Sequence, residues 1–160
     1  MDIRLITEND YKAVAEMIAR SVKSSNFASF YPQKSIDDII RSLDEEGVKK
    51  RASWTHFYVI EEDNEIVACG AIGPYWDSLT ESSLFSIFVD EGHQGKGYGR
   101  KIIEILEKDE YFTRAKRIEI PAAMSAIPFY KKMGYEHKNG ELTYTEEHFC
   151  MEKFNDKNNF

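Results

Sequence analysis

The N-terminal part of the chain carries one strand pattern followed by two helix patterns. Residues 2–6 alternate between polar and apolar side chains, which predicts a strand. Thr7 and Asp10 then form a capping box, and apolar residues follow on one side of the predicted helix: Val14, Met17, Ile18 and Val22. A second capping box, Ser35 with Asp38, predicts another helix, with apolar residues at Ile39, Ile40 and Leu43.

The rest of the chain alternates between strand and helix patterns. Residues 56–62 and 65–73 predict a hairpin around Asp63-Asn64, and residues 82–89 predict the next strand. A helix is predicted over 97–108, where a broad apolar side is formed by Ile102, Ile103, Ile105 and Leu106. The order is completed by a strand at 117–121, a helix at 125–133 capped by Ser125, and strands at 135–138 and 148–154. This order predicts a single α+β domain of mixed α/β type over residues 1–154, with a polar tail at 155–160.

Composition and charge narrow the classes of function. With 160 residues, 42% of them hydrophobic, the chain can bury one sizeable core. The formal net charge is −7 and the basic residues are scattered, which argues against a nucleic-acid partner. No apolar run of about 18 residues and no secretory leader are present, so we expect no membrane partner and a cytoplasmic location.

Cysteine and histidine give no sign of a metal or redox site. Cys69 and Cys150 are isolated, which suits a reducing compartment. The histidines have no metal-ligand spacing; they are His56, His93, His137 and His148. We therefore expect no metal.

A glycine-rich loop at 88–99 is the most informative segment of the chain. It follows a strongly apolar strand pattern and leads into a helix, so its backbone N–H groups can converge on an anion at the positive end of the helix dipole. A P-loop is excluded because Gly95-Lys96 is followed by Gly97, and a dinucleotide fingerprint fits poorly because the glycines are evenly spaced. A third pattern, Gln/Arg-x-x-Gly-x-Gly/Ala, is satisfied by Gln94, Gly97 and Gly99.

A second motif lies downstream, where residues 125–135 read Ser-Ala-Ile-Pro-Phe-Tyr-Lys-Lys-Met-Gly-Tyr. Pro128 suits the first turn of a helix, and Gly134 suits its left-handed exit. Together the two motifs resemble the GNAT superfamily of acetyl-CoA-dependent N-acetyltransferases. The resemblance implies a mostly antiparallel twisted sheet of about seven strands, with a splay between the fourth and fifth strands and about four flanking helices.

The resemblance also implies acetyl-CoA as co-substrate and names the residues that would hold it. The loop would bind the pyrophosphate, and the backbone of the preceding strand would pair with the pantetheine arm. The matching residues are Ile87, Phe88, Val89, Gln94, Gly95, Lys96, Gly97, Tyr98, Gly99 and Arg100. Tyr130 matches the tyrosine that hydrogen-bonds the coenzyme A sulfur, and a phenol there can act as general acid to the departing thiolate.

The general base departs from the family pattern. Counting back from the loop, the position of a glutamate in some members falls on Ser83, which cannot act as a base. Strand alternation places Glu81 on the same face as Ser83, Phe85 and Ile87, so Glu81 is a tentative base acting through water. A solvated carboxylate without function explains Glu81 equally well, Asp77 and His56 are weaker candidates, and ordered water alone is another route.

Aromatic residues predict where the acceptor amine binds. Phe30, Tyr31, Tyr75 and Trp76 are tentative pocket residues. With Asp77, Glu81 and Glu141 nearby, such a wall suits a cationic amine, although a lid or a homodimer contact fits the same residues.

Two functions remain open at this point. One is an N-acetyltransferase acting on a small-molecule amine or a protein amino group. The other is a coenzyme A-binding regulatory or interaction module with reduced catalysis, which the serine at position 83 keeps open. A nucleotide-binding protein that uses the glycines differently is a third and weaker reading.

Overall fold

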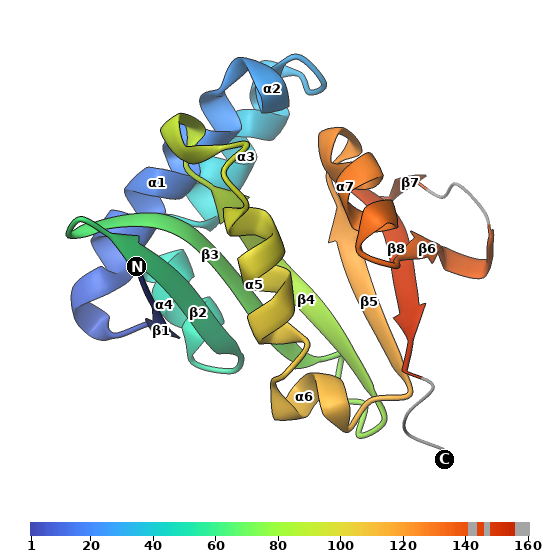
Figure 1. The fold of residues 1–160 in the computed structure, drawn as a ribbon. Coiled ribbons are helices and arrows are strands. Elements are labelled where there is room, and N and C mark those ends of the chain that lie inside the picture. Colours follow the sequence, from blue (N-terminus) through green and yellow to red (C-terminus); the bar gives the residue numbers. More distant parts are fainter. Residues whose placement is uncertain (141–143, 146–147, 156–160) are drawn as a thin grey trace.

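A twisted sheet runs through the molecule and carries helices on both faces (Figure 1). The computed structural model describes residues 1–140, 144–145 and 148–155. The strand order is β1-β2-β3-β4-β5-β8-β6, with β7 beside β8. The strands are β1 (Asp2–Leu5), β2 (His56–Glu62), β3 (Glu65–Pro74), β4 (Glu81–Val89), β5 (Arg117–Ala122), β6 (Glu136–His137), β7 (Tyr144–Thr145) and β8 (His148–Phe154).

All neighbouring strands in this sheet are antiparallel except β4 and β5, which are parallel. This confirms the predicted α+β class with a mostly antiparallel sheet. The β2–β3 hairpin turns at Asp63 and Asn64, whose φ angles of 50° and 65° are both left-handed. Such a turn matches the right-handed twist of the strands it joins.

The helices form two groups. The first group is α1 (Tyr11–Lys23), α2 (Ser25–Ala28), α3 (Gln33–Ser42) and α4 (Glu45–Ala52), and the second is α5 (Tyr98–Leu106), α6 (Glu110–Thr113) and α7 (Ile127–Lys132). Helix α1 and helix α5 cover opposite faces of the sheet, because alternate residues of β3 face each of them: Ile66 packs with Val14, whereas Val67 packs with Ile102. The described residues thus contain more helices than the resemblance implied, the unpredicted ones being the short α2, α4 and α6.

Helix starts differ from the predicted ones at two places. Helix α3 begins at Gln33 after an extended Pro32, so Ser35 is a buried residue inside the helix and the predicted capping box is wrong. Ser125 lies in a 3-10 turn, Met124–Ala126, and Ala126 is the residue that precedes α7. The first capping residues do meet as predicted, because the Asp10 carboxylate accepts hydrogen bonds from the Thr7 backbone and hydroxyl at 2.8 and 3.0 Å.

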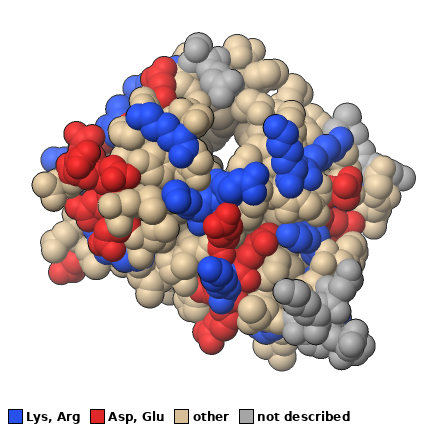
Figure 2. Space-filling view, in the orientation of Figure 1, with Lys and Arg blue, Asp and Glu red and all other residues tan. Residues whose placement is uncertain are grey.

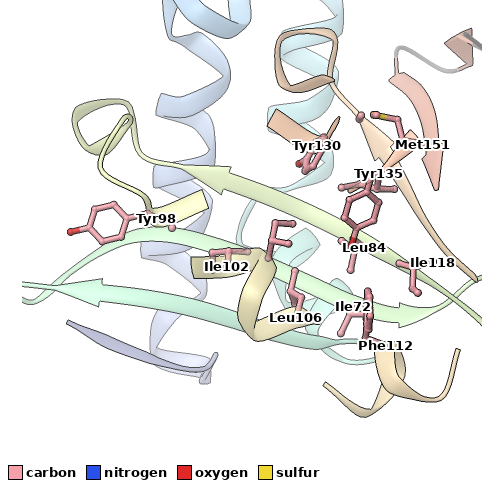
Figure 3. Close-up of a cluster of buried hydrophobic side chains, with 14 of the residues drawn as sticks. Ile72, Leu84, Tyr98, Ile102, Leu106, Phe112, Ile118, Tyr130, Tyr135 and Met151 are labelled. Atoms are coloured by element: carbon pink, nitrogen blue, oxygen red, sulfur yellow. The ribbon is translucent and has the colours of Figure 1, made fainter. Parts of the chain in front are cut away.

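The larger core lies between the sheet, α5 and α7 (Figure 3). Side chains from all three converge there, among them Ile72, Leu84, Ile102, Leu106, Ile118 and Tyr130. At the C-terminal edge, Asn155 donates its backbone N–H to the Lys116 carbonyl at 2.9 Å, and the remainder of the predicted tail, 156–160, lies outside the described residues. Throughout the described ranges, every helix is too short or too polar to span a lipid bilayer.

Candidate functional site

The parallel strands β4 and β5 are paired over only part of their length. The register joins Glu81 to Arg117, Ser82 to Ile118 and Ser83 to Glu119, and beyond these pairs the two strands separate. A cavity of about 920 Å³ occupies the gap. It is lined by residues of α5 and α7 from one face of the sheet and by residues of α1, α3 and α4 from the other.

Strand β4 contains a bulge at the point where it borders this cavity. Phe85 pairs with Ala71 and Phe88 with Cys69, so Ser86 and Ile87 together stand opposite Gly70 alone. Ser86 has a left-handed φ of 53°. Because of the extra residue, Phe85 packs on the α1 side and Ile87 on the α5 side. The prediction that Phe85 and Ile87 share a face is therefore wrong.

The glycine-rich loop joins β4 to α5 at one end of the cavity. Gly95 and Gly97 have φ angles of 77° and 88°, and Gly97 is the residue that precedes α5. Gly99 has another constraint, because a Cβ on it would stand 3.3 Å from a ring carbon of Phe129 on α7. The first N–H groups of α5 have no partner within the helix, so they are available to an anion in the cavity.

The structure brings nearly all predicted coenzyme residues together. The cavity is lined by Ile87, Phe88, Val89, Gln94, Gly95, Gly97, Tyr98, Gly99 and Arg100, together with Tyr130. Lys96 is exposed and does not line it. Arg100 and Lys132 add positive charge, and basic side chains gather on both sides of the hollow between α5 and α7 (Figure 2). The loop end of the cavity therefore suits a phosphate-bearing ligand.

Tyr130 presents an unpartnered phenol to the cavity. Its side chain comes from α7 (Figure 3). Only 5% of the residue is exposed. Its hydroxyl donates to no atom of the described residues, although the residue lines the cavity. Burial raises the pKa of Tyr130 above its ordinary value of 10.0, so the phenol stays protonated over the neutral range.

Only one of the four aromatic residues predicted for the acceptor pocket reaches the cavity. Tyr31 lines it and accepts a hydrogen bond from the Met124 backbone at 3.0 Å. Phe30 and Trp76 are exposed, and the Tyr75 ring instead stacks under Arg117, whose guanidinium carbon is 5.2 Å away. The cavity wall on this side is completed by Ser21, Ser24, Phe27, Ile39, Ser42, Leu43, Arg51 and Ser86.

The candidate bases lie elsewhere. Glu81 is 2.9 Å from Arg117, which also binds Glu119 and Glu152, so its carboxylate belongs to a charged cluster outside the cavity. Asp77 is exposed, and His56 is bound to Asp109 at 2.8 Å. Glu141 lies outside the described residues. Within the described ranges, no carboxylate or imidazole lines the cavity.

Arg51 is a cavity residue that the sequence did not single out. It ends a run of basic residues, Lys49-Lys50-Arg51, in the last turn of α4, a pattern that usually indicates a solvated helix end. Its guanidinium carbon instead lies 4.7 Å from the centre of the Phe85 ring, and its Nη1 donates to the Ser86 hydroxyl at 3.0 Å.

Comparisons with known proteins agree with this geometry. A family model described as an acetyltransferase (GNAT) domain matches residues 53–137. No curated protein sequence matches the chain significantly.

Several solved structures share the fold. The PaiA N-acetyltransferase of Thermoplasma acidophilum, in complex with coenzyme A, superposes with a TM-score of 0.81 at 18% identity and covers 96% of this chain and 98% of its own. A GCN5-related N-acetyltransferase of Rhodopseudomonas palustris gives 0.76 at 20% identity, covering 96% and 94%. A ribosomal-protein-alanine N-acetyltransferase of Brucella melitensis gives 0.64 at 16% identity, covering 96% and 99%.

Proposed function

This chain belongs to the GNAT acetyltransferase family, and from that premise we propose that it transfers an acetyl group from acetyl-CoA to a primary amine. The acceptor is an amine of a small molecule or an amino group of a protein. The observation that carries the proposal is the cavity through the β4–β5 gap, which has the glycine loop at one end and the free Tyr130 phenol beside it.

The donor is held by the loop and by β4. The N–H groups at the start of α5 bind the pyrophosphate, with Arg100 and Lys132 supplying further positive charge. The pantetheine arm lies in the gap and pairs with the backbone of Ile87, Phe88 and Val89, where β5 no longer does so. Coenzyme A bound to the Thermoplasma relative of the same fold supports this assignment.

The reaction is a direct displacement at the thioester. The neutral amine nitrogen attacks the carbonyl carbon, the carbon–sulfur bond breaks, and the thiolate takes the proton of the Tyr130 hydroxyl. Because no described carboxylate or imidazole lines the cavity, the proton of the amine passes to water in place of Glu81. Solvent then reprotonates Tyr130.

The same lack of a base in the described cavity wall favours a second candidate, a coenzyme A-binding regulatory module. To distinguish the acetyltransferase from the binding module, the protein is incubated with acetyl-CoA and a panel of primary amines while free thiol is measured. We expect amine-dependent release of thiol. Saturable binding of acetyl-CoA without thiol release from any amine would instead establish the module, and a thermal shift larger with NAD or ATP than with coenzyme A would contradict both.

A further inference from the structure

Arg51 is a charged residue held in an apolar part of the cavity wall. The guanidinium carbon lies 4.7 Å from the ring centre of Phe85 and 5.5 Å from that of Trp54. The residue is half-buried, and burial lowers the pKa of its guanidinium, which nevertheless remains charged at neutral pH. The two rings attract the cation through their π faces, but they do not replace the hydrogen bonds that water makes to a guanidinium, so its N–H groups still need acceptors.

The described residues supply little of that compensation. Of the five N–H groups of a guanidinium, one donates to the Ser86 hydroxyl, and no carboxylate of the described residues forms an ion pair with Arg51. Two arginines outside the cavity are different: Arg4 is held by Asp10 and Glu61, and Arg117 by three glutamates. Arg51 therefore retains free donors where it lines the cavity.

The position of Arg51 relates this charge to the reaction. Its anchor, Ser86, directly precedes Ile87, Phe88 and Val89, the strand segment assigned to the donor arm. Ser86 is held in a left-handed conformation, which is costly for a residue other than glycine and is concentrated at functional sites. The cavity wall contributed by α1, α3 and α4 otherwise offers hydroxyl and apolar side chains, without a carboxylate among its described residues.

We propose that the acceptor is a primary amine that also carries a carboxylate, and that Arg51 binds this carboxylate. The inference rests on the proposed acetyl transfer and names its substrate class. It replaces the expectation of an acidic pocket in which Asp77, Glu81 and Glu141 lie near a cationic amine. A carboxylate fits better than a phosphate because Arg51 is the one cation in the described wall on this side, and it balances a single negative charge.

The test compares matched acceptors. Free amino acids are assayed with acetyl-CoA, and the best of them is compared with its carboxamide and with its decarboxylated amine. We expect kcat/KM to be roughly 10- to 100-fold higher for the free amino acid. Arg51→Gln abolishes this preference, and Arg51→Lys retains part of it. Arg41→Gln is the matched control, because Arg41 lies on the exposed side of α3 and pairs with Asp38.

The outcomes separate the inference from the proposed function. Two results would overturn the inference but not acetyl transfer. One is an equal loss of kcat/KM for all three acceptors in Arg51→Gln, and the other is a higher kcat/KM for the two acceptors that lack the carboxylate. Faster turnover of phosphoethanolamine than of every amino acid overturns it in favour of a phosphate. If no amine is turned over, calorimetric titration of N-acetyl amino acids into the coenzyme A complex decides. Binding that Arg51→Gln abolishes, with coenzyme A affinity unchanged, supports the inference, and absence of binding to the unmodified protein overturns it.

Discussion

The glycines of the loop between β4 and α5 are required for two different physical reasons. Gly95 and Gly97 adopt positive φ angles of 77° and 88°, which side chains other than glycine reach only at a cost. Gly99 is constrained by space, because a Cβ on it would stand 3.3 Å from the Phe129 ring, which would have to shift by a few tenths of an ångström. The even spacing of glycines in the sequence does not reveal this division.

Gly97→Ala should weaken coenzyme A binding. A left-handed alanine costs about 1–2 kcal/mol, and relaxation of the loop would turn its N–H groups away from the pyrophosphate. We expect the dissociation constant from calorimetry to rise at least roughly tenfold. Gly92→Ala is the control, since Gly92 has no neighbour that a Cβ would meet and no positive φ. Equal affinities for the two variants would refute this account of the loop.

Tyr130→Phe should slow acetyl transfer while leaving the cavity intact. The ring remains, but the thiolate loses its proton donor, and general acid catalysis contributes about 10²- to 10⁴-fold. We expect kcat to fall by roughly 100-fold, with little change in coenzyme A affinity. Since burial raises the pKa of Tyr130, the unmodified enzyme should not lose this donor at neutral pH. Tyr58→Phe, which removes a phenol bound to Asp109 away from the cavity, should leave kcat unchanged. A similar kcat in both variants would remove Tyr130 from the mechanism.

The cavity residues near the glycine loop were predictable from the sequence, and those of the wall around Arg51 were not. The glycine-rich loop and Tyr130 belong to short sequence motifs, and the geometry of each motif is local. Arg51 and Ser86 meet at the β4 bulge opposite Gly70, and neither residue carries a sign of this contact in the sequence. The aromatic residues Phe30 and Trp76 were predicted to line the acceptor pocket, yet they are exposed.

At the scale of elements, strands were predicted more accurately than helix starts. Alternation and the Asp63-Asn64 turn place β2 and β3 within a residue of their observed bounds. Helix α4 was not predicted, because its eight residues are too few for a clear apolar period. It does have a capping residue, Asp44, whose carboxylate accepts a hydrogen bond from the Gly47 N–H at 2.9 Å. For α3, both Pro32 and Ser35 are residue types that favour the start of a helix. The helix begins after Pro32, and Ser35 is buried inside it.

The contact that ties β1 to the start of α1 should make stability depend on acid pH. Arg4 forms two hydrogen bonds to Asp10, at 2.7 and 3.0 Å, and these bonds hold the pKa of Asp10 below its ordinary value of 3.8. A carboxyl with a lowered pKa stabilises the folded state above its ordinary pKa, and this contribution is lost as pH falls through the folded-state pKa.

Asp10→Asn should therefore lower the free energy of unfolding by about 1–3 kcal/mol at pH 7, and by less at pH 3. Urea denaturation at pH 7, 5, 4 and 3 measures the difference. Asp37→Asn on the exposed side of α3 serves as control. A difference for Asp10→Asn that stays constant with pH would show that Arg4 does not act through the charge of Asp10.

At the scale of the whole molecule, the sheet consists of two parts joined weakly. Three residue pairs connect β4 to β5, and the bond of Arg117 on β5 to Glu81 on β4, at 2.9 Å, reinforces that junction. A donor whose arm fills the gap would add backbone pairing to β4 beyond Ser83, where the described residues of β5 do not pair with it. Donor binding should thus stabilise the part that contains β5 and α7.

Coenzyme A at about 100 times its dissociation constant should raise the melting temperature by roughly 5–10 °C, as expected from about 2.7 kcal/mol of added stability. Hydrogen exchange should slow at amides of β5 and α7 as well as in the loop. ADP, which has the pyrophosphate but no pantetheine arm, should protect the loop alone. Protection by coenzyme A confined to the loop would contradict insertion of the arm between the strands.

The order of strands and helices was predictable from periodicity, whereas the gap was expected only through the resemblance. An apolar run such as Ile87-Phe88-Val89 is expected for a strand in the middle of a sheet and equally for a strand beside a cavity. Parallel pairing of β4 with β5 and its end after Ser83 depend on contacts between distant segments. Local patterns do not contain that information.

The bulge at Ser86 also affects how relatives of this chain are compared. Upstream of Ser86, counting residues back from the loop gives the correct side of the sheet only for a homologue with the same extra residue. Without it, the residue aligned with Ser83 belongs to the opposite side, and a catalytic glutamate would be assigned to the wrong position. Roles along β4 should therefore be transferred between relatives by superposing their structures and matching the side of the sheet, and not by counting residues in an alignment.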